Sequence, residues 1–307
     1  MELRLKNNDH IIYTLDLNFR GIQGTIAAYL IPHKLGAVLV ECGPGSTIPT
    51  LVDGLNSKGY SVTDITDVLL THIHLDHAGA AGWLAKQGAN IHVHPVGAPH
   101  LRNPEKLLAS AERIYGDALD ALWGEFLPVP NDRLIILQDG DVIEINELAF
   151  KVLDTPGHAN HHYVYLFEEA CFSGDIGGVR MSGINHLRLP TPPPEFNLES
   201  WRQSLNVLRK EEFAYIIATH FGVFSDPEWH MAAVEDALDE IEHWMEENVP
   251  RGLSSEDFNS QYVDWENERA IAAGINQNSM DLYDTSNPSW ISAAGLQRYW
   301  QKFRQDN

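Results

Sequence analysis

Directly after the apolar run Val68–Leu70, residues 71–77 read Thr71-His72-Ile73-His74-Leu75-Asp76-His77. If the chain stays extended, His72 and His74 point to the same side, because side chains alternate along a strand. Asp76 and His77 then lie in a turn that leads into a helix of small residues. Imidazole and carboxylate groups are the ligands that borderline divalent metals prefer. This segment therefore predicts a metal site rather than a chance cluster of histidines at a strand end.

Three further ligand-type residues follow apolar, strand-like runs, each next to a glycine or a threonine. They are His158 after Ala149–Leu153, Asp175 after Ala170–Ser173, and His220 after Tyr215–Ala218. Proteins that combine strands and helices usually build their sites at strand ends, where the sheet fixes position and the loops adapt. Together, the four strand ends predict one metal centre formed by His72, His74, Asp76, His77, His158, Asp175 and His220.

Strand-like and helix-like segments alternate along most of the chain. The expected strands are Ile11–Leu15, Thr25–Ile31, Ala37–Glu41, Asp67–Leu70 and Ile91–His94, then Leu134–Leu137, Val142–Ile145, Ala149–Leu153, Tyr163–Phe167, Ala170–Ser173 and Tyr215–Ala218. The expected helices are Thr47–Ser57, Ala78–Lys86, Pro104–Phe126 and Leu198–Arg209. Two such successions predict an α/β (α+β) protein with two mixed sheets packed together and helices outside.

From about Asp226 the pattern becomes purely helical. Amphipathic stretches are expected over Trp229–Glu247, Ser255–Ala273 and Pro288–Phe303. We therefore divide the chain into a catalytic domain, residues 1–226, and a C-terminal helical extension, residues 227–307.

Charge and composition exclude several classes of function. The chain has 43 acidic residues against 21 Lys and Arg, a net charge of −22 that repels phosphate backbones, so we expect no nucleic-acid partner. No run of about 18 apolar residues exists, and the polar N-terminal segment lacks the pattern of a signal peptide. Cys42 and Cys171 are interpreted as inert, reduced thiols. We therefore expect a cytoplasmic protein that does not bind membranes.

The ligand pattern resembles the metallo-β-lactamase superfamily, on the signature His72-x-His74-x-Asp76-His77 followed in order by His158, Asp175 and His220. The resemblance covers about residues 10–225 and implies a four-layer αββα sandwich. It also implies that His72, His74 and His158 hold one metal, that Asp76, His77 and His220 hold a second, and that Asp175 bridges them.

The resemblance implies two divalent metal ions, zinc foremost, with iron and manganese as alternatives. A metal-bridging hydroxide would attack the substrate, with Asp76 and Asp175 as the catalytic carboxylates. One position departs from the family pattern: Glu41 stands where an aspartate usually orients a ligand histidine from outside, a role that its longer side chain can also fill.

Other residues are given lesser roles. We interpret His92 and His94 as structural, because no carboxylate follows them, and His161 and His162 as pocket or outer residues. Candidate pocket residues lie in loops and in one helix: Phe19, Arg20, Ile22, Gln23, Tyr115, Trp123, Arg180, Arg188 and Pro192–Phe196. Packing or solvent exposure explains each of these equally well.

The superfamily supports many reactions, so the function is chosen by exclusion. The acidic chain argues against the nucleases, and His74 argues against the flavodiiron proteins, which carry Glu there. The expected function is hydrolysis of a small acyl substrate (a lactone, an ester or a thioester), as in lactonase-like and glyoxalase II-like enzymes. Basic residues that would bind glutathione are not evident, which argues against glyoxalase II itself. The alternative is a mononuclear iron sulfur dioxygenase, and a homodimer is left open.

Overall fold

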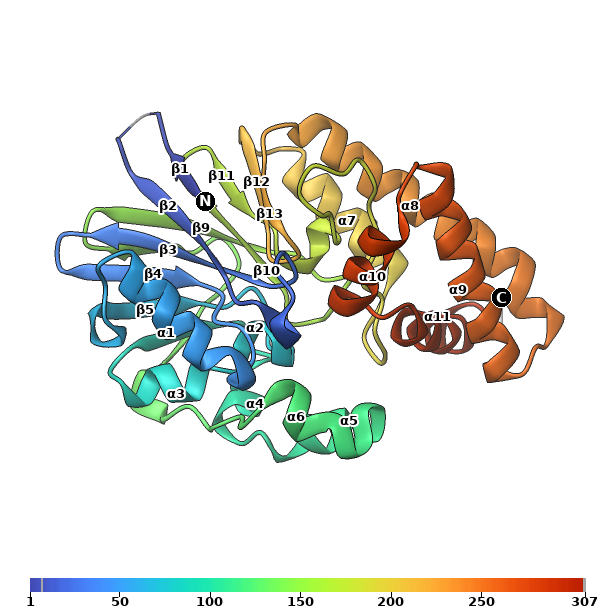
Figure 1. The fold of residues 1–307 in the computed structure, drawn as a ribbon, viewed down its shortest axis with the longest axis horizontal. Helices are drawn as coiled ribbons and strands as arrows, with labels where there is room; N and C mark the ends of the chain where they lie inside the picture. Colours follow the sequence, from blue (N-terminus) through green and yellow to red (C-terminus); the bar gives the residue numbers. More distant parts are fainter. Residues whose placement is uncertain (7, 306–307) are drawn as a thin grey trace.

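The protein is a sandwich of two β-sheets, seen in a computed structural model that describes residues 1–6 and 8–305 (Figure 1). Within these residues the seven-stranded first sheet contains, in order, β1 (Glu2–Arg4), β2 (Ile11–Asp16), β3 (Ala27–His33), β4 (Gly36–Val40), β5 (Ile65–Leu69), β6 (Asn90–Val93) and β7 (Leu134–Ile136). The six-stranded second sheet contains β13 (Gly222–Phe224), β12 (Tyr215–Ala218), β11 (Ala170–Phe172), β10 (Tyr163–Phe167), β9 (Leu148–Asp154) and β8 (Val142–Ile145). Both sheets are mixed, since β4 to β7 are parallel in the first and β11 pairs parallel with β12 in the second.

Helices cover the outer faces of both sheets. The first sheet carries α1 (Ile48–Ser57), α2 (Leu75–Ala78) and α3 (Ala81–Lys86), and the second carries α7 (Leu198–Leu208) and α8 (Pro227–Asn248). After β6 the chain forms α4 (Ala98–Arg102), α5 (Glu105–Tyr115) and α6 (Leu119–Trp123). The last third adds α9 (Ser255–Ala272), α10 (Gln277–Ser286) and α11 (Ser289–Phe303). The predicted αββα sandwich with C-terminal helices is therefore confirmed.

The alternating directions of side chains along the strands explain why the sheets and helices stack in this way. In β4, Val38 and Val40 point into the apolar layer between the sheets, whereas Ala37 and Leu39 join the cluster beneath α1. Both faces of such a strand are buried, which is why it reads as a continuous apolar run.

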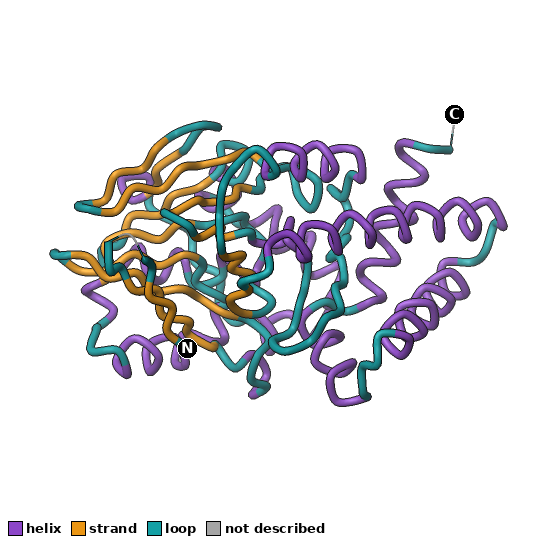
Figure 2. The backbone as a smooth tube through the Cα atoms, turned by 90° about the horizontal axis from the view of Figure 1, so that it is seen from above, coloured by secondary structure: helices purple, strands orange, loops and turns teal. Residues whose placement is uncertain are grey.

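The C-terminal helices lie beside the sheets, as the two views show (Figures 1 and 2). They contact the loop that follows Asp175: the Tyr283 hydroxyl donates to His186 O at 2.7 Å, and Thr191 Oγ1 donates to Ser292 O at 3.2 Å. The approach of α11 is so close that a Cβ on Gly295 would lie 1.8 Å from Thr191 O. The C-terminal helices therefore support the loop that follows Asp175.

Several elements differ from the sequence-based expectation. The expected helix over residues 104–126 is interrupted, because Gly116 adopts a left-handed φ of 52° and ends α5. Helix α10 was not predicted, since its sequence is polar and only Met280 and Tyr283 of its side chains are buried. The short strands β1 and β13 were not predicted either. The division of the chain at residue 226 stays a prediction, and α8 packs with α7 on the second sheet.

None of the helices within residues 1–6 and 8–305 combines the length and the apolarity that crossing a bilayer requires.

Candidate metal centre

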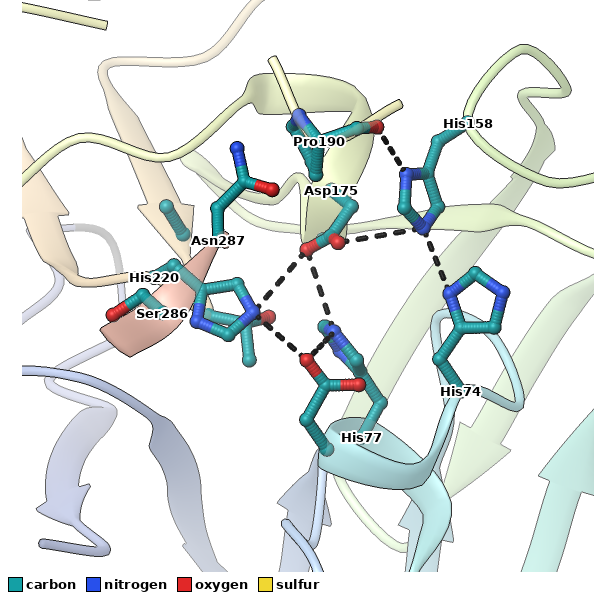
Figure 3. Close-up of polar contacts among 12 residues, drawn as sticks. His74, His77, His158, Asp175, Pro190, His220, Ser286 and Asn287 are labelled. Atoms are coloured by element: carbon teal, nitrogen blue, oxygen red, sulfur yellow. Dashed lines mark hydrogen bonds and ion pairs between the residues drawn. The ribbon is translucent and has the colours of Figure 1, made fainter. Parts of the chain in front are cut away.

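The seven predicted ligands lie together where strands of both sheets end. Figure 3 labels His74, His77, His158, Asp175 and His220 among them. His72 and His74 follow β5 of the first sheet, and the short helix α2 then carries Asp76 and His77. The remaining three follow strands of the second sheet: His158 after β9, Asp175 after β11 and His220 after β12. The site therefore joins the two halves of the sandwich.

One group of ligand atoms consists of three imidazole nitrogens. His74 Nδ1 lies 2.9 Å from His72 Nε2 and 2.9 Å from His158 Nε2. Three nitrogens that converge in this way form a face that can hold one metal ion.

A second group lies on the other side of Asp175. Asp76 Oδ2 is 3.3 Å from His220 Nε2 and 3.6 Å from His77 Nε2. One carboxylate oxygen and two imidazole nitrogens form a second candidate site.

Asp175 lies between the two groups, with one oxygen facing each (Figure 3). Its Oδ2 is 3.4 Å from His158 Nε2, whereas its Oδ1 is 3.4 Å from His77 Nε2 and 3.7 Å from His220 Nε2. This is the placement that a carboxylate shared by two metal ions requires.

Hydrogen bonds on the far side of the imidazole rings fix their orientation. The Nδ1 atom of His158 lies 2.7 Å from Pro190 O, and that of His220 lies 2.8 Å from Thr25 O. Because a carbonyl accepts, each Nδ1 carries the proton and each Nε2 keeps its lone pair for the centre.

Glu41 orients His77 in the same way. Its Oε1 lies 3.0 Å from His77 Nδ1 and accepts hydrogen bonds from the hydroxyls of Thr71 and Thr219. Glu41, His72 and His77 form a third group of possible metal ligands. The carboxylate of Glu41, however, already accepts hydrogen bonds from His77, Thr71 and Thr219. The structure thus places Glu41 where the family pattern puts its orienting acid.

The protonation states of His72 and Asp76 suit metal binding. Burial acts to lower the pKa of His77, but the carboxylates around it raise this pKa well above its usual value, so a metal ion would displace a proton there. Burial lowers the pKa of His72 well below its usual value, and neighbouring imidazoles add to this effect. Burial acts to raise the pKa of Asp76, but the imidazoles of His77 and His220 lower it to about 2. At neutral pH Asp76 is therefore anionic, and His72 is neutral with a free lone pair.

Two buried polar atoms at the centre have no hydrogen-bond partner among the described residues. They are His77 Nε2 and Asp175 Oδ1, which face each other at 3.4 Å. Buried polar atoms are costly when left without a partner, and a cation between these two would satisfy both. The residues present therefore fit a metal.

Comparison with known proteins agrees with this geometry. The sequence model of the metallo-beta-lactamase superfamily matches residues 21–220, which is more than half of the chain. The chain belongs to this superfamily.

Individual superfamily members share part of the sequence or the whole fold. The metallo-beta-lactamase fold-containing protein ST1585 of Sulfurisphaera tokodaii is 28% identical over 61% of this chain and 72% of its own. A hydroxyacylglutathione hydrolase of Rhodopseudomonas palustris is 32% identical over 41% of this chain and 38% of its own length. The crystal structure of ST1585 from Sulfolobus tokodaii aligns with a TM-score of 0.65 at 18% identity, covering 93% of this chain and 98% of that one.

A cavity of about 390 Å³ opens above the candidate centre of this superfamily member. His74, Asp76, His158 and Asp175 lie in its lining. One wall is aromatic: the Phe19 ring stacks on Trp123 at 5.1 Å between centroids, and Tyr115 meets Trp123 edge-on at 5.2 Å. The cavity is therefore shaped for a ligand with an apolar part.

Part of the lining was not predicted from the sequence. Lys106 and Arg113 of α5 line the cavity, as do Asn287, Pro288 and Ile291 of the C-terminal region. A sequence pattern can show that such residues share a helix face, but not that this face lies over the candidate metal centre. The C-terminal helices thus complete the pocket.

Three other histidines from the sequence analysis have hydrogen-bond or ion-pair partners of their own. His92 Nε2 lies 2.8 Å from Asp67 Oδ1, and His94 Nε2 lies 3.3 Å from Asp154 Oδ1. His162 Nε2 accepts a hydrogen bond from the backbone N–H of Asp175 at 3.1 Å.

Of the remaining candidates, His161 lines the pocket, with its Nε2 3.3 Å from Glu195. Arg180 and Arg188 instead pair with Asp226 and Asp284 outside the lining.

The two cysteines are buried and unpaired. Burial raises the pKa of each thiol, that of Cys42 with a smaller contribution from Glu41. Neither thiol is therefore activated as a nucleophile.

Proposed function

We propose that this protein is a dinuclear metal-dependent hydrolase that cleaves a small acyl substrate: a lactone, an ester or a thioester. The observation that carries this proposal is the position of Asp175, whose two oxygens face two separate ligand groups. A mononuclear site has no need of the second group.

The seven side chains have distinct roles in this proposal. His72, His74 and His158 would hold the first ion, Asp76, His77 and His220 the second, and Asp175 both. Bound divalent ions, zinc foremost, would activate water as a nucleophile and polarise the carbonyl of the substrate. Glu41, Pro190 O and Thr25 O hold the imidazoles in place.

The surroundings support an acyl substrate over a phosphodiester. The net charge of −22 repels nucleic acids, and the aromatic wall of Phe19, Tyr115 and Trp123 in the pocket suits the apolar part of an acyl substrate. The relative from R. palustris is named for the hydrolysis of an acylglutathione, which is a thioester. The two free thiols also support the proposed cytoplasmic location.

Metal analysis and a substrate panel test the proposal. Protein purified without chelator should contain about two equivalents of zinc, iron or manganese per chain. The metal-loaded protein should hydrolyse lactones, aryl esters or thioesters, and chelation should abolish turnover. Cleavage of bis(p-nitrophenyl) phosphate should be slower by about two orders of magnitude or more.

Three results would contradict the proposal. Preference for the phosphodiester would refute the acyl-hydrolase assignment. A single iron that resists replacement, with sulfite formed from glutathione persulfide, would indicate the dioxygenase instead. Protein that binds no metal when supplied with zinc, iron or manganese would refute both.

A further inference from the structure

Three basic side chains line the pocket above the candidate metal centre. Lys106 and Arg113 come from α5, and Arg20 comes from the turn η1 (Phe19–Gly21). Lys106, Ser110 and Arg113 follow one another at spacings of four and three residues, so they share one face of α5. All three line the cavity, which shows that this face points toward it.

These three cations have no acidic partner among the described residues. Other arginines, such as Arg202 and Arg304, are paired with glutamates. The N–H donors and the positive charge of an unpaired side chain are all available to a ligand.

The carboxylates of the lining are engaged elsewhere. Asp76 and Asp175 belong to the candidate metal centre. Glu195 lies 3.3 Å from His161 Nε2 and accepts from the backbone N–H of Asn160 at 3.0 Å. The pocket therefore provides three charged donors and leaves no free acid to neutralise them.

The conformation of the η1 turn holds Arg20 at the pocket. Arg20 has a left-handed φ of 57°, which L-residues other than Asn and Asp rarely adopt. Its neighbour Phe19 is buried and stacks on Trp123, so the turn is anchored to the wall that also carries Tyr115. Conformations of this kind are retained where the surrounding structure enforces them, often at ligand sites.

We infer that the pocket selects an acyl substrate that carries an anionic group, with Lys106, Arg113 and Arg20 as its anion subsite and the apolar walls receiving the acyl part. This inference rests on the proposed function and names the substrate class of the same site. Arginine and lysine bind carboxylate and phosphate through charge-assisted hydrogen bonds, which are stronger than neutral ones.

Matched pairs of probes that differ by one charge test the inference. The first pair is S-hexanoyl-3-mercaptopropionate and its methyl ester, with the charge on the thiol side. The second pair is the S-butyl monothioester of adipic acid and its methyl ester, with the charge on the acyl side. The measured quantity is the ratio of kcat/KM for the anionic probe to kcat/KM for its ester.

In the metal-loaded wild-type protein, this ratio should exceed one for at least one pair, and that pair identifies the end that carries the charge. The double variant Lys106→Gln/Arg113→Gln should lower the ratio about tenfold. Arg102→Gln is the matched control, because Arg102 is an exposed arginine of the adjacent α4 outside the cavity lining, and it should keep the wild-type ratio. The urea unfolding midpoints of the variants verify that both are folded.

A binding measurement separates this inference from the proposed function. N-Hexanoyl-β-alanine and its methyl ester are the amide counterparts of the first pair, and their Kd values can be measured by calorimetry without turnover. Tighter binding of the acid, lost in the double variant, supports the subsite even if no thioester is hydrolysed. Hydrolysis with a ratio at or below one for both pairs, or a ratio unchanged by the double variant, would overturn the inference and leave the hydrolase proposal intact. Failure to bind either amide, together with no hydrolysis, would overturn both.

Discussion

Asp175 is the residue on which the dinuclear interpretation depends most. It follows β11 in the turn η6 (Gly174–Gly177), and its backbone N–H donates to His162, which fixes the start of this turn. Its two oxygens then face His158 on one side and His77 on the other. Asp76 contacts only the second group, and Glu41 contacts His77 at Nδ1, on the far side of the ring from the candidate centre.

Replacing Asp175 by alanine should remove metal and activity together. Activity should fall at least about 100-fold, since even outer partners of metal ligands change activity by about 10–100-fold. Elemental analysis should show loss of at least one metal equivalent. Cys42→Ala is the control, because Cys42 is equally buried in the same region but donates only to His77 O. If the Cys42 variant lost as much activity as the Asp175 variant, chemistry carried by the metals alone would be refuted.

Helix α11 shows how an element outside the sandwich shapes the pocket. It packs against the loop after Asp175 so closely that only glycine fits at position 295. The same loop contains Pro190, whose carbonyl oxygen lies 2.7 Å from His158 Nδ1, and Pro192, which lines the pocket. Movement of α11 would therefore reach both a ligand histidine and the substrate.

Gly295→Ala should lower stability even though alanine favours a helix by about 1 kcal/mol. The added Cβ would meet Thr191 O, and overpacking of this kind costs about 1–3 kcal/mol. Because Thr191 O is a backbone atom, we expect an overpacking cost at the upper end of this range and therefore a net loss of about 2 kcal/mol in the free energy of unfolding, measured by urea denaturation, and a higher KM. Ala294→Ser on the exposed face of the same helix should change stability by less than about 0.5 kcal/mol. A Gly295→Ala protein as stable as wild type would show that α11 is free to shift.

At the scale of the whole molecule, the candidate centre lies across the two sheets. His72 to His77 follow β5 of the first sheet, whereas His158, Asp175 and His220 follow strands of the second. Metal ions held there would bind the folded sandwich and not the unfolded chain, so their binding energy would stabilise the fold.

Chelation should therefore lower the melting temperature as well as abolish activity. With each metal ion at about 100 times its Kd, the lost stabilisation is about 2.7 kcal/mol per ion, which for a protein of this size corresponds to about 4 °C per ion. Scanning calorimetry before and after chelation measures the shift, and added zinc should reverse it. The Asp175→Ala protein should shift less. An unchanged melting temperature in wild type would mean that the two sheets are not joined through metal.

The residues that meet in the candidate centre could be predicted from the sequence because their signals are local. A strand-like run followed by His72, His74, Asp76 and His77 needs only the alternation of a strand and the turn after it. Layered sheets and terminal helices follow from hydrophobic periodicity in the same way. The polar helix α10 lacks that periodicity and was missed.

Contacts between distant segments could not be read in this way. Glu41 reaches Thr219, 178 residues away, and that contact depends on how the two sheets pack. Lys106 and Arg113 belong to an ordinary amphipathic helix until α5 is placed over the centre. The identity of the candidate ligands depends on the order of residues directly after each strand. The pocket and its charge depend instead on which helix and sheet faces pack together, and burial of apolar surface across the whole chain determines that packing.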